Sequence, residues 1–292
     1  MATRIGLWLA CGLVLAGCAS STAYRVTRSD VIRPCETSVR DDDLLVGVAL
    51  SGGGSRAALF GTAGLEALAG LRTADGVSVI DKISHLSSVS GGSIAASYYA
   101  LKKPGRDVKV LNADGTLSEA YRTFFEKYRA DLSQDFETSL AEIVGERLYG
   151  AARLQDLSVR EKAGDSPGLI INTTLYNNGR RLALTTLPPE VFDYDFFADL
   201  ERSVQERGRP LNVAPRVRER WNRLRPMTPI EIGIDPCPAG LAGSVTGSVF
   251  PPLVGPLTLK IGDEETYWHA GDGGLYENQG LESLILLYLK QL

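Results

Sequence analysis

Ser90 is the side chain in this sequence with the surroundings expected of a nucleophile. It lies in the segment Ser88–Gly92, which joins an apolar stretch to a stretch with a helical pattern. A nucleophile elbow needs a serine at a sharp strand-to-helix turn with small residues two positions to either side, because larger side chains collide with the strand or the helix. Gly92 meets this need, whereas Ser88 stands where glycine is usual. The segment predicts a nucleophile, although serine and glycine also form ordinary turns.

A glycine-rich loop, Ser51–Ala57, follows another apolar stretch and has three interpretations. Its three consecutive glycines leave backbone amides unshielded and able to stabilise an oxyanion. The spacing of Gly52, Gly54 and Ala57 also fits a dinucleotide-binding fingerprint, with Asp75 as the ribose-binding acid. However, Asp75 lies in a turn signal, and no Gly-Lys pair of a P-loop occurs anywhere in the chain. An ordinary tight turn is the third interpretation.

Asp272 is an acidic residue bracketed by glycines, in the segment Gly271–Gly274. A single Asp-Gly pair is by default a structural turn. The stretch before this aspartate suits a strand and the stretch after it suits a helix. We therefore expect Asp272 at the edge of a sheet, as we do for the two other glycine turns.

The elements that must position these clusters are strands and helices in alternation. Leu44–Leu50 is a continuous apolar run, which is typical of a strand buried on both faces. Ile83–Val89 is expected to form a second strand. Leu59–Leu71 and Ile94–Lys102 are expected to form helices after the two turns. Such strand–turn–helix units predict an α/β sheet with helices on its faces, which binds ligands at the carboxyl ends of its strands.

The second half of the chain is less clearly patterned. Leu169–Asn172 and Arg181–Leu184 are expected to be strands that flank a turn at Asn177-Asn178-Gly179. Region 118–225 has two interpretations, a lid over the site or plain surface helices. No linker divides residues 41–292, so we expect one domain there. The apolar run at its end carries no helix stop signal, which is compatible with a domain that is C-terminally incomplete.

The first residues resemble the signal peptide of a bacterial lipoprotein. Arg4 precedes an apolar stretch, Ile5–Leu15, of 11 residues, and a membrane-spanning helix needs about 20. The sequence Leu-Ala-Gly-Cys that ends at Cys18 resembles a lipobox. The resemblance implies removal of residues 1–17 and acylation of Cys18, with residues 18–40 as a flexible tether. Ala19 then favours the outer membrane, with the domain facing the periplasm.

The remaining cysteines and the net charge of the chain limit the kinds of binding site and partner to expect. Once the signal is removed and Cys18 is acylated, Cys35 and Cys237 are left, either as a disulfide or as two buried thiols. No Cys/His spacing suggests a zinc site. The formal charge is −4, and the basic cluster Arg216–Arg225 is interrupted by an acid. The composition therefore argues against nucleic acid as a partner, and it does not indicate an oligomeric state.

Taken together, the three clusters resemble the patatin-like phospholipase family. The resemblance covers Leu44–Leu101 and Gly243–Leu287 strongly and Leu169–Leu184 more weakly. Residues Ser244–Pro252 are similar to a segment that this family carries before its Asp-Gly-Gly motif. The resemblance implies a three-layer α/β/α sandwich with a mostly parallel central sheet.

The resemblance also implies a mechanism, a Ser–Asp dyad that works without histidine. Ser90 would be the nucleophile and Asp272 its proton acceptor. The oxyanion loop would consist of Gly52, Gly53, Gly54 and Arg56. Because a carboxylate is a weak base near neutral pH, a dry apolar surrounding would be needed to strengthen it. The expected substrates are membrane phospholipids or other acyl esters, and no cofactor or metal is expected.

Two alternatives compete with this interpretation. The first is a Ser–His–Asp hydrolase, for which His85 and His269 are the only histidines; each is better explained as a structural residue. The second is a non-catalytic patatin-fold envelope lipoprotein that binds lipid or protein partners. The unusual Ser88 favours this second alternative, whereas the retention of the nucleophile, the aspartate and the loop glycines favours catalysis.

Overall fold

The computed structural model describes residues 23–26, 28, 35, 45–133, 147–208, 212–241, 244–245, 257–263 and 265–291. The expected signal peptide, the acylation site Cys18 and most of the tether lie outside these residues. So does most of the segment Ser244–Pro252. Among the described helices, none is both long and apolar enough to cross a membrane.

The described strands form one open, mixed sheet. Its order is β1-β6-β7-β4-β3-β2, and β5 pairs with β4 off this path. Pairs β1/β6, β2/β3 and β3/β4 are parallel, whereas β4/β5, β4/β7 and β6/β7 are antiparallel. It follows that only β5 and β7 oppose the other strands, so the sheet is mostly parallel. The bounds are β1 Ala23–Val26, β2 Val46–Leu50, β3 Ile83–Val89, β4 Gly168–Leu175, β5 Arg180–Thr185, β6 Leu257–Ile261 and β7 Tyr267–Asp272.

One edge of β4 carries two different strands, one after the other. β3 runs parallel to β4 and its last pair is Val89 with Asn172. β7 runs antiparallel along the same strand and its last residue, Asp272, pairs with Thr173. Since Asn172 and Thr173 are neighbours, the carboxyl ends of β3 and β7 meet head to head. This junction is what positions the site described below.

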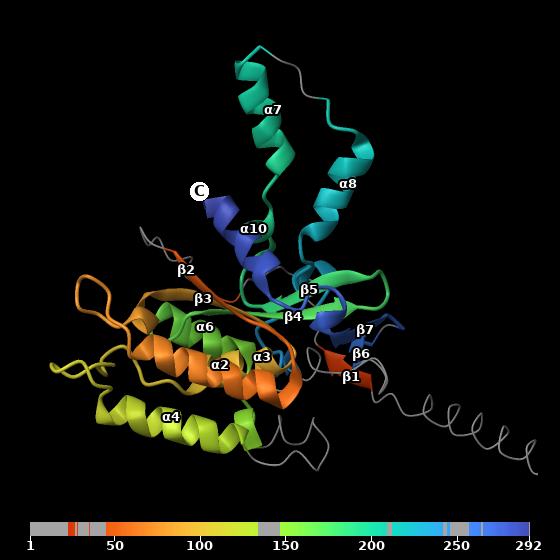
Figure 1. Cartoon of the computed structure of the whole chain (residues 1–292). Coiled ribbons are helices and arrows are strands. Elements are labelled where there is room, and N and C mark those ends of the chain that lie inside the picture. Colours follow the sequence, from red (N-terminus) through yellow and green to blue (C-terminus); the bar gives the residue numbers. More distant parts are fainter. Residues whose placement is uncertain are drawn as a thin grey trace, which may run out of the picture.

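Helices cover both faces of the sheet (Figure 1). α2, α3, α4 and α6 lie on one side, where their apolar residues share a core with Leu169 and Ile171 of β4. α10 lies on the other side, where Leu284 and Leu287 pack against Ile170. Alternate residues of β4 thus pack into two different cores, because successive side chains of a strand point to opposite faces of the sheet. The helices are α2 Gly54–Ala69, α3 Gly91–Lys102, α4 Glu119–Leu132, α6 Leu154–Lys162, α7 Phe196–Glu206, α8 Pro215–Leu224 and α10 Leu281–Gln291.

The expected α/β pattern is confirmed, with differences at the ends of elements. α2 begins at Gly54, inside the glycine-rich loop, rather than near Leu59. β4 and β5 form the expected hairpin, with Leu175 opposite Arg180. β7 is the strand expected before Asp272, whereas β6 and its pairing with β7 were not expected from the sequence pattern.

Helices α7 and α8 form an arm that extends from the α10 side of the sheet, away from α2 (Figure 1). Neither helix contains a buried residue. They pack on each other through aromatic rings, with Phe196 and Phe197 at 5.1 and 5.9 Å from Trp221 between ring centroids. Arg218 of α8 also pairs with Asp195, the N-cap of α7, at 3.2 Å.

Cys35 and Cys237 are joined by a disulfide bond. The bond links positions that are 202 residues apart, and Cys35 is buried. It ties the N-terminal segment to the segment that precedes β6. Two separate thiols, the other interpretation of these cysteines, are not what the structure contains.

Candidate active site

Ser90 occupies a strained turn between β3 and α3. Its φ of 51° is in the left-handed region, and among the described residues it is the only one other than glycine with a positive φ. Such a conformation costs on the order of 1–3 kcal/mol and is maintained by the surrounding fold. Although Ser90 is the N-cap residue of α3, its side chain makes no capping hydrogen bond. The hydroxyl is thereby directed away from the helix, as in a nucleophile elbow.

Asp272 accepts a hydrogen bond from the hydroxyl of Ser90. The distance from Ser90 Oγ to Asp272 Oδ2 is 2.7 Å, across 182 residues of sequence. The other carboxylate oxygen, Oδ1, accepts the backbone N–H of Gly274 at 2.7 Å. Thr174 of β4 donates its hydroxyl to the backbone carbonyl of Asp272 at 2.9 Å. These contacts fix the carboxylate with one oxygen facing the serine.

Close backbone approach explains the glycines after Ser90. A Cβ added at Gly91 would lie 1.9 Å from the carbonyl oxygen of Gly54, and one at Gly92 would lie 2.2 Å from that of Leu50. Both distances are far below van der Waals contact. The first turn of α3 therefore packs directly against the end of β2 and the start of α2.

Ser88 fits the elbow despite standing where glycine is usual. Its side chain is fully buried on β3 and donates a hydrogen bond to the carbonyl of Ile170 on β4 at 3.1 Å. A buried hydroxyl is costly when it has no partner, and this one has a partner. Its presence is consequently no sign of a collapsed site.

Two of the three glycines in the glycine-rich loop lie at the start of α2, and the third is hydrogen-bonded to another loop. Gly53 and Gly54 have φ values of 143° and 66°, which side-chain-bearing residues rarely adopt. They open α2, whose N-terminus has no side-chain cap, and the first amides of a helix have no partner within it. The amide of Gly52, in contrast, donates to the carbonyl of Asn278 at 2.9 Å. This corrects the expectation for Gly52, whose role is to hold the loop in place.

Arg56 lies on the first turn of α2 and is exposed. Within the described part of the chain its guanidinium makes no hydrogen bond or ion pair, so it is available to a ligand near the loop. Phe60 lies one turn further along the same face and is 80% exposed.

Asn278 is a site residue that the sequence analysis missed. A Cβ on Gly52 would lie 2.1 Å from its Oδ1, and a Cβ on Gly274 would lie 2.7 Å from the same atom. The side chain thus lies between the glycine-rich loop and the loop that follows Asp272. Its only sequence signal is an amide six positions after the aspartate, which by itself has many structural explanations.

Asn172 is a second missed residue, and it supports the elbow from behind. It is fully buried on β4 and donates to the side chain of Ser87 at 2.9 Å and to the carbonyl of Ser88 at 3.0 Å. Ser283 of α10 donates to its Oδ1 at 2.7 Å. A satisfied buried network of this kind rigidifies its surroundings. A polar residue at the end of an apolar strand was the available signal.

Neither histidine is in a position to assist Ser90. His85 precedes it by five residues on β3, which is about 17 Å of strand, and stacks edge-to-face on Tyr288. His269 precedes Asp272 by three residues, which is about 10 Å, and its Nδ1 lies 3.0 Å from the hydroxyl of Thr258. Both fit the structural roles expected for them, and the serine–aspartate pair is the arrangement present.

Asp75 is not placed where the ribose-binding acid of a dinucleotide site would have to lie. Asp75 follows α2, whose 16 residues separate it from the glycine-rich loop by about 24 Å. Its carboxylate is engaged with Lys82 at 2.8 Å. The hydrogen bond from Lys82 is also the main reason that the pKa of Asp75 falls to about 2. The described residues contain no cluster of acidic, histidine or cysteine side chains able to hold a metal ion.

No protein-family model matches this chain, and no curated protein matches it. The chemistry of the site is therefore argued from its own geometry. A strained serine, a carboxylate that accepts a hydrogen bond from its hydroxyl, and two helix-terminal amides in the neighbouring loop form the set of groups that acyl transfer requires.

Proposed function

We propose that this chain is a patatin-like serine hydrolase that cleaves acyl esters of membrane lipids, most of all phospholipids. The observation that carries the proposal is the hydrogen bond from Ser90 Oγ to Asp272 Oδ2 at 2.7 Å, at an elbow that no histidine reaches. Supporting it are the glycine-rich loop at the start of α2 and the mostly parallel sheet with helices on both faces.

The proposed reaction has two halves. In the first, Asp272 takes the hydroxyl proton of Ser90 while the oxygen attacks the ester carbonyl. The amides of Gly53 and Gly54 stabilise the oxyanion. The ester C–O bond then breaks, and the leaving alcohol takes the proton from Asp272. In the second half, Asp272 deprotonates a water, whose oxygen attacks the acyl-serine. The bond between the acyl carbon and Ser90 Oγ then breaks, the fatty acid leaves, and Asp272 returns the proton to Ser90.

Exposed apolar side chains beside the site favour a lipid substrate. Phe60 on α2 is 80% exposed, and Leu275, three residues after Asp272, is 51% exposed. Both adjoin the loops that contain the proposed catalytic groups. Arg56, one turn before Phe60, offers a cation to a phosphate in the same substrate. A lipid with an acyl ester and a phosphodiester satisfies both features.

The proposed location of the protein follows from its N-terminus. Acylation of Cys18 would anchor it to a bilayer, and Ala19 favours the outer membrane, with the domain facing the periplasm. Substrate and enzyme would then share one surface. This anchor lies in residues outside the described structure.

The test is hydrolysis of a chromogenic acyl ester and of phospholipid vesicles by the wild-type chain and by Ser90→Ala. Ser133→Ala, an exposed serine that follows α4, is the matched control. We expect Ser90→Ala to lose activity on both substrates with unchanged circular dichroism, and the control to keep it. A fully active Ser90→Ala protein would refute the proposal. An inactive, folded wild type would favour the non-catalytic lipoprotein.

A further inference from the structure

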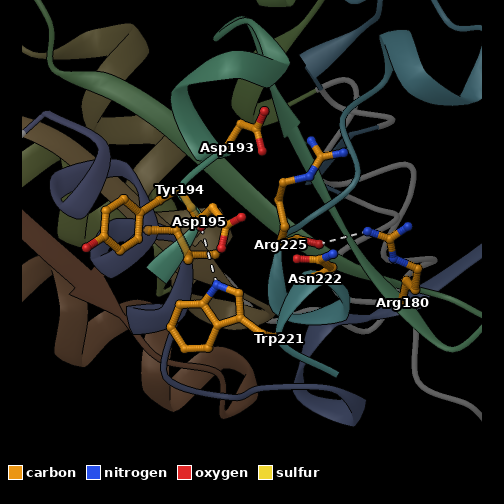
Figure 2. Close-up of a pocket in the computed structure, with 8 residues that line it drawn as sticks. Arg180, Asp193, Tyr194, Asp195, Trp221, Asn222 and Arg225 are labelled. Carbon is orange, nitrogen blue, oxygen red and sulfur yellow. Dashed lines mark hydrogen bonds between the residues drawn. The ribbon is translucent and has the colours of Figure 1, made fainter. Parts of the chain in front are cut away.

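A cavity of about 370 Å³ lies at the base of the α7–α8 arm, on the α10 side of the sheet (Figure 2). It is separate from the residues of the serine–aspartate site. Its volume is within the range of small-molecule sites. The residues that line it are Arg180, Asp193, Tyr194, Asp195, Trp221, Asn222, Arg225 and Leu286.

Two arginines line the cavity close to one another. Arg180, the first residue of β5, donates from one guanidinium nitrogen to the backbone carbonyl of Arg225 at 3.1 Å. Its Nε is buried and has no hydrogen-bond partner. Arg225 pairs with Glu231 through one nitrogen, and its remaining N–H groups are not used in this pair. The two guanidinium groups therefore retain N–H groups that can donate hydrogen bonds to an anion.

The surroundings of Arg180 disfavour its positive charge. Burial lowers the pKa of its guanidinium, and the positive charge of Arg225 lowers it further. Glu231 opposes this effect only in part. An anion between the two arginines would relieve both their repulsion and the loss of solvation.

The cavity also offers groups suited to a cation. Asp193 is exposed at its rim, and its carboxylate makes no hydrogen bond or ion pair within the described part of the chain. Figure 2 shows this carboxylate and the guanidinium of Arg225 in the same upper part of the view, with no hydrogen bond drawn between them. Trp221 is fixed by donating its Nε1 proton to the carbonyl of Tyr194 at 3.3 Å. Carboxylates and aromatic rings are the usual partners of ammonium groups.

We propose that this cavity binds a zwitterionic phosphate ester, in which Arg180 and Arg225 hold the phosphate and Asp193 holds a neighbouring ammonium group. Two guanidinium groups that line one cavity match the several acceptor oxygens of a phosphate better than the two of a carboxylate. The unpaired acid beside them distinguishes a zwitterion from a simple anion. The ligand is either the head group of a lipid or a free phosphoamine, which share this chemistry.

The test is calorimetric titration of the full-length Ser90→Ala chain with phosphoethanolamine and, separately, with inorganic phosphate. Ser90→Ala keeps the result independent of the proposed hydrolysis. We expect Arg180→Gln to weaken binding of both compounds about tenfold to a hundredfold, the effect of losing a charged hydrogen-bond partner. Asp193→Asn should weaken only phosphoethanolamine, to a similar degree, and leave inorganic phosphate unchanged.

Arg216→Gln is the matched control, since this arginine lies on α8 but does not line the cavity. Equal weakening by Arg216→Gln and Arg180→Gln would overturn the proposal in favour of a general charge effect. Unchanged binding in Arg180→Gln and Asp193→Asn would overturn it outright, as would no binding by the folded parent protein.

Sedimentation with vesicles distinguishes the two sources of the ligand. Binding to phosphatidylethanolamine vesicles that is lost in Asp193→Asn, and that phosphoethanolamine competes away, identifies a lipid head group. Binding of phosphoethanolamine alone, with no dependence of vesicle binding on Asp193, identifies a free phosphoamine. Either result supports the shared chemistry of the cavity.

Discussion

Replacing Asp272 with asparagine should abolish hydrolysis without disturbing the fold. The carboxylate has two distinct oxygens, of which Oδ1 accepts the amide of Gly274 and Oδ2 accepts the hydroxyl of Ser90, each at 2.7 Å. An asparagine has only one acceptor oxygen. The backbone N–H of Gly274 cannot move away and can only donate, so it holds that oxygen at the Oδ1 position. The amide NH₂ group then faces Ser90, where it can donate a hydrogen bond but cannot accept the serine proton.

The size of the effect follows from the loss of this proton acceptor. General-base catalysis contributes roughly 10²- to 10⁴-fold, which is about 3–5 kcal/mol of transition-state stabilisation. We therefore expect kcat/KM to fall by this factor in Asp272→Asn. Because serine and aspartate act as a unit, the double variant Ser90→Ala/Asp272→Asn should be no slower than Ser90→Ala alone.

The assay is kcat/KM for a chromogenic acyl ester, with thermal unfolding measured on the same samples. Asp107→Asn is the matched control, because this exposed aspartate makes no hydrogen bond or ion pair in the described structure. It should leave both quantities unchanged. If Asp272→Asn keeps more than a tenth of wild-type kcat/KM, Asp272 is not the base. Multiplicative losses in the double variant would show that the two residues act independently.

Three further predictions concern the elbow and the disulfide. Gly91→Ala places a Cβ 1.9 Å from the carbonyl oxygen of Gly54, so activity should fall about a hundredfold or more as the oxyanion loop is displaced. Gly64→Ala, with nothing within 4 Å, should instead raise the free energy of unfolding by about 1 kcal/mol; a loss of activity in both would contradict the steric argument. Ser88→Gly removes the hydrogen bond to Ile170 and should lower the free energy of unfolding by about 1–2 kcal/mol. The rate of hydrolysis should stay within threefold of wild type. A tenfold gain in that rate would mean that Ser88 restrains the elbow. Cys35→Ser removes a disulfide between residues 202 positions apart and should lower the free energy of unfolding by about 2–5 kcal/mol. Denaturant titration measures this change, and equal unfolding midpoints for the variant and the wild type would refute it.

The α7–α8 arm is a part of the fold whose orientation the sequence pattern did not predict. Region 118–225 was expected to be either a lid or surface helices, and α7 and α8 lie in it. The pattern did not decide between a lid and surface helices. Their direction depends on where Phe196 and Phe197 meet Trp221 and where Arg218 meets Asp195. These are contacts between helices that spacing along one helix does not encode.

The sequence by itself determined the features that arise from neighbouring residues. The elbow at Ser90 needs small residues beside it, and α2 needs a loop that leaves its first amides open. Both follow from local sterics over a few positions, so the motif and the element appear together in the chain. The alternation of apolar strand and helical stretch likewise predicted an α/β sheet with helices on its faces.

Only the tertiary structure decided which of these parts meet. Ser90 and Asp272 are 182 residues apart, and they come together because β3 and β7 end at adjacent positions on one edge of β4. The same assembly commits the amide of Gly52 to Asn278 and buries Asn172 behind the elbow. Strand order and register are set by the burial of whole faces, a sum over many distant contacts. No short segment contains that sum, which is why local patterns indicated Ser90 and Asp272 separately and their pairing was expected only from the family resemblance.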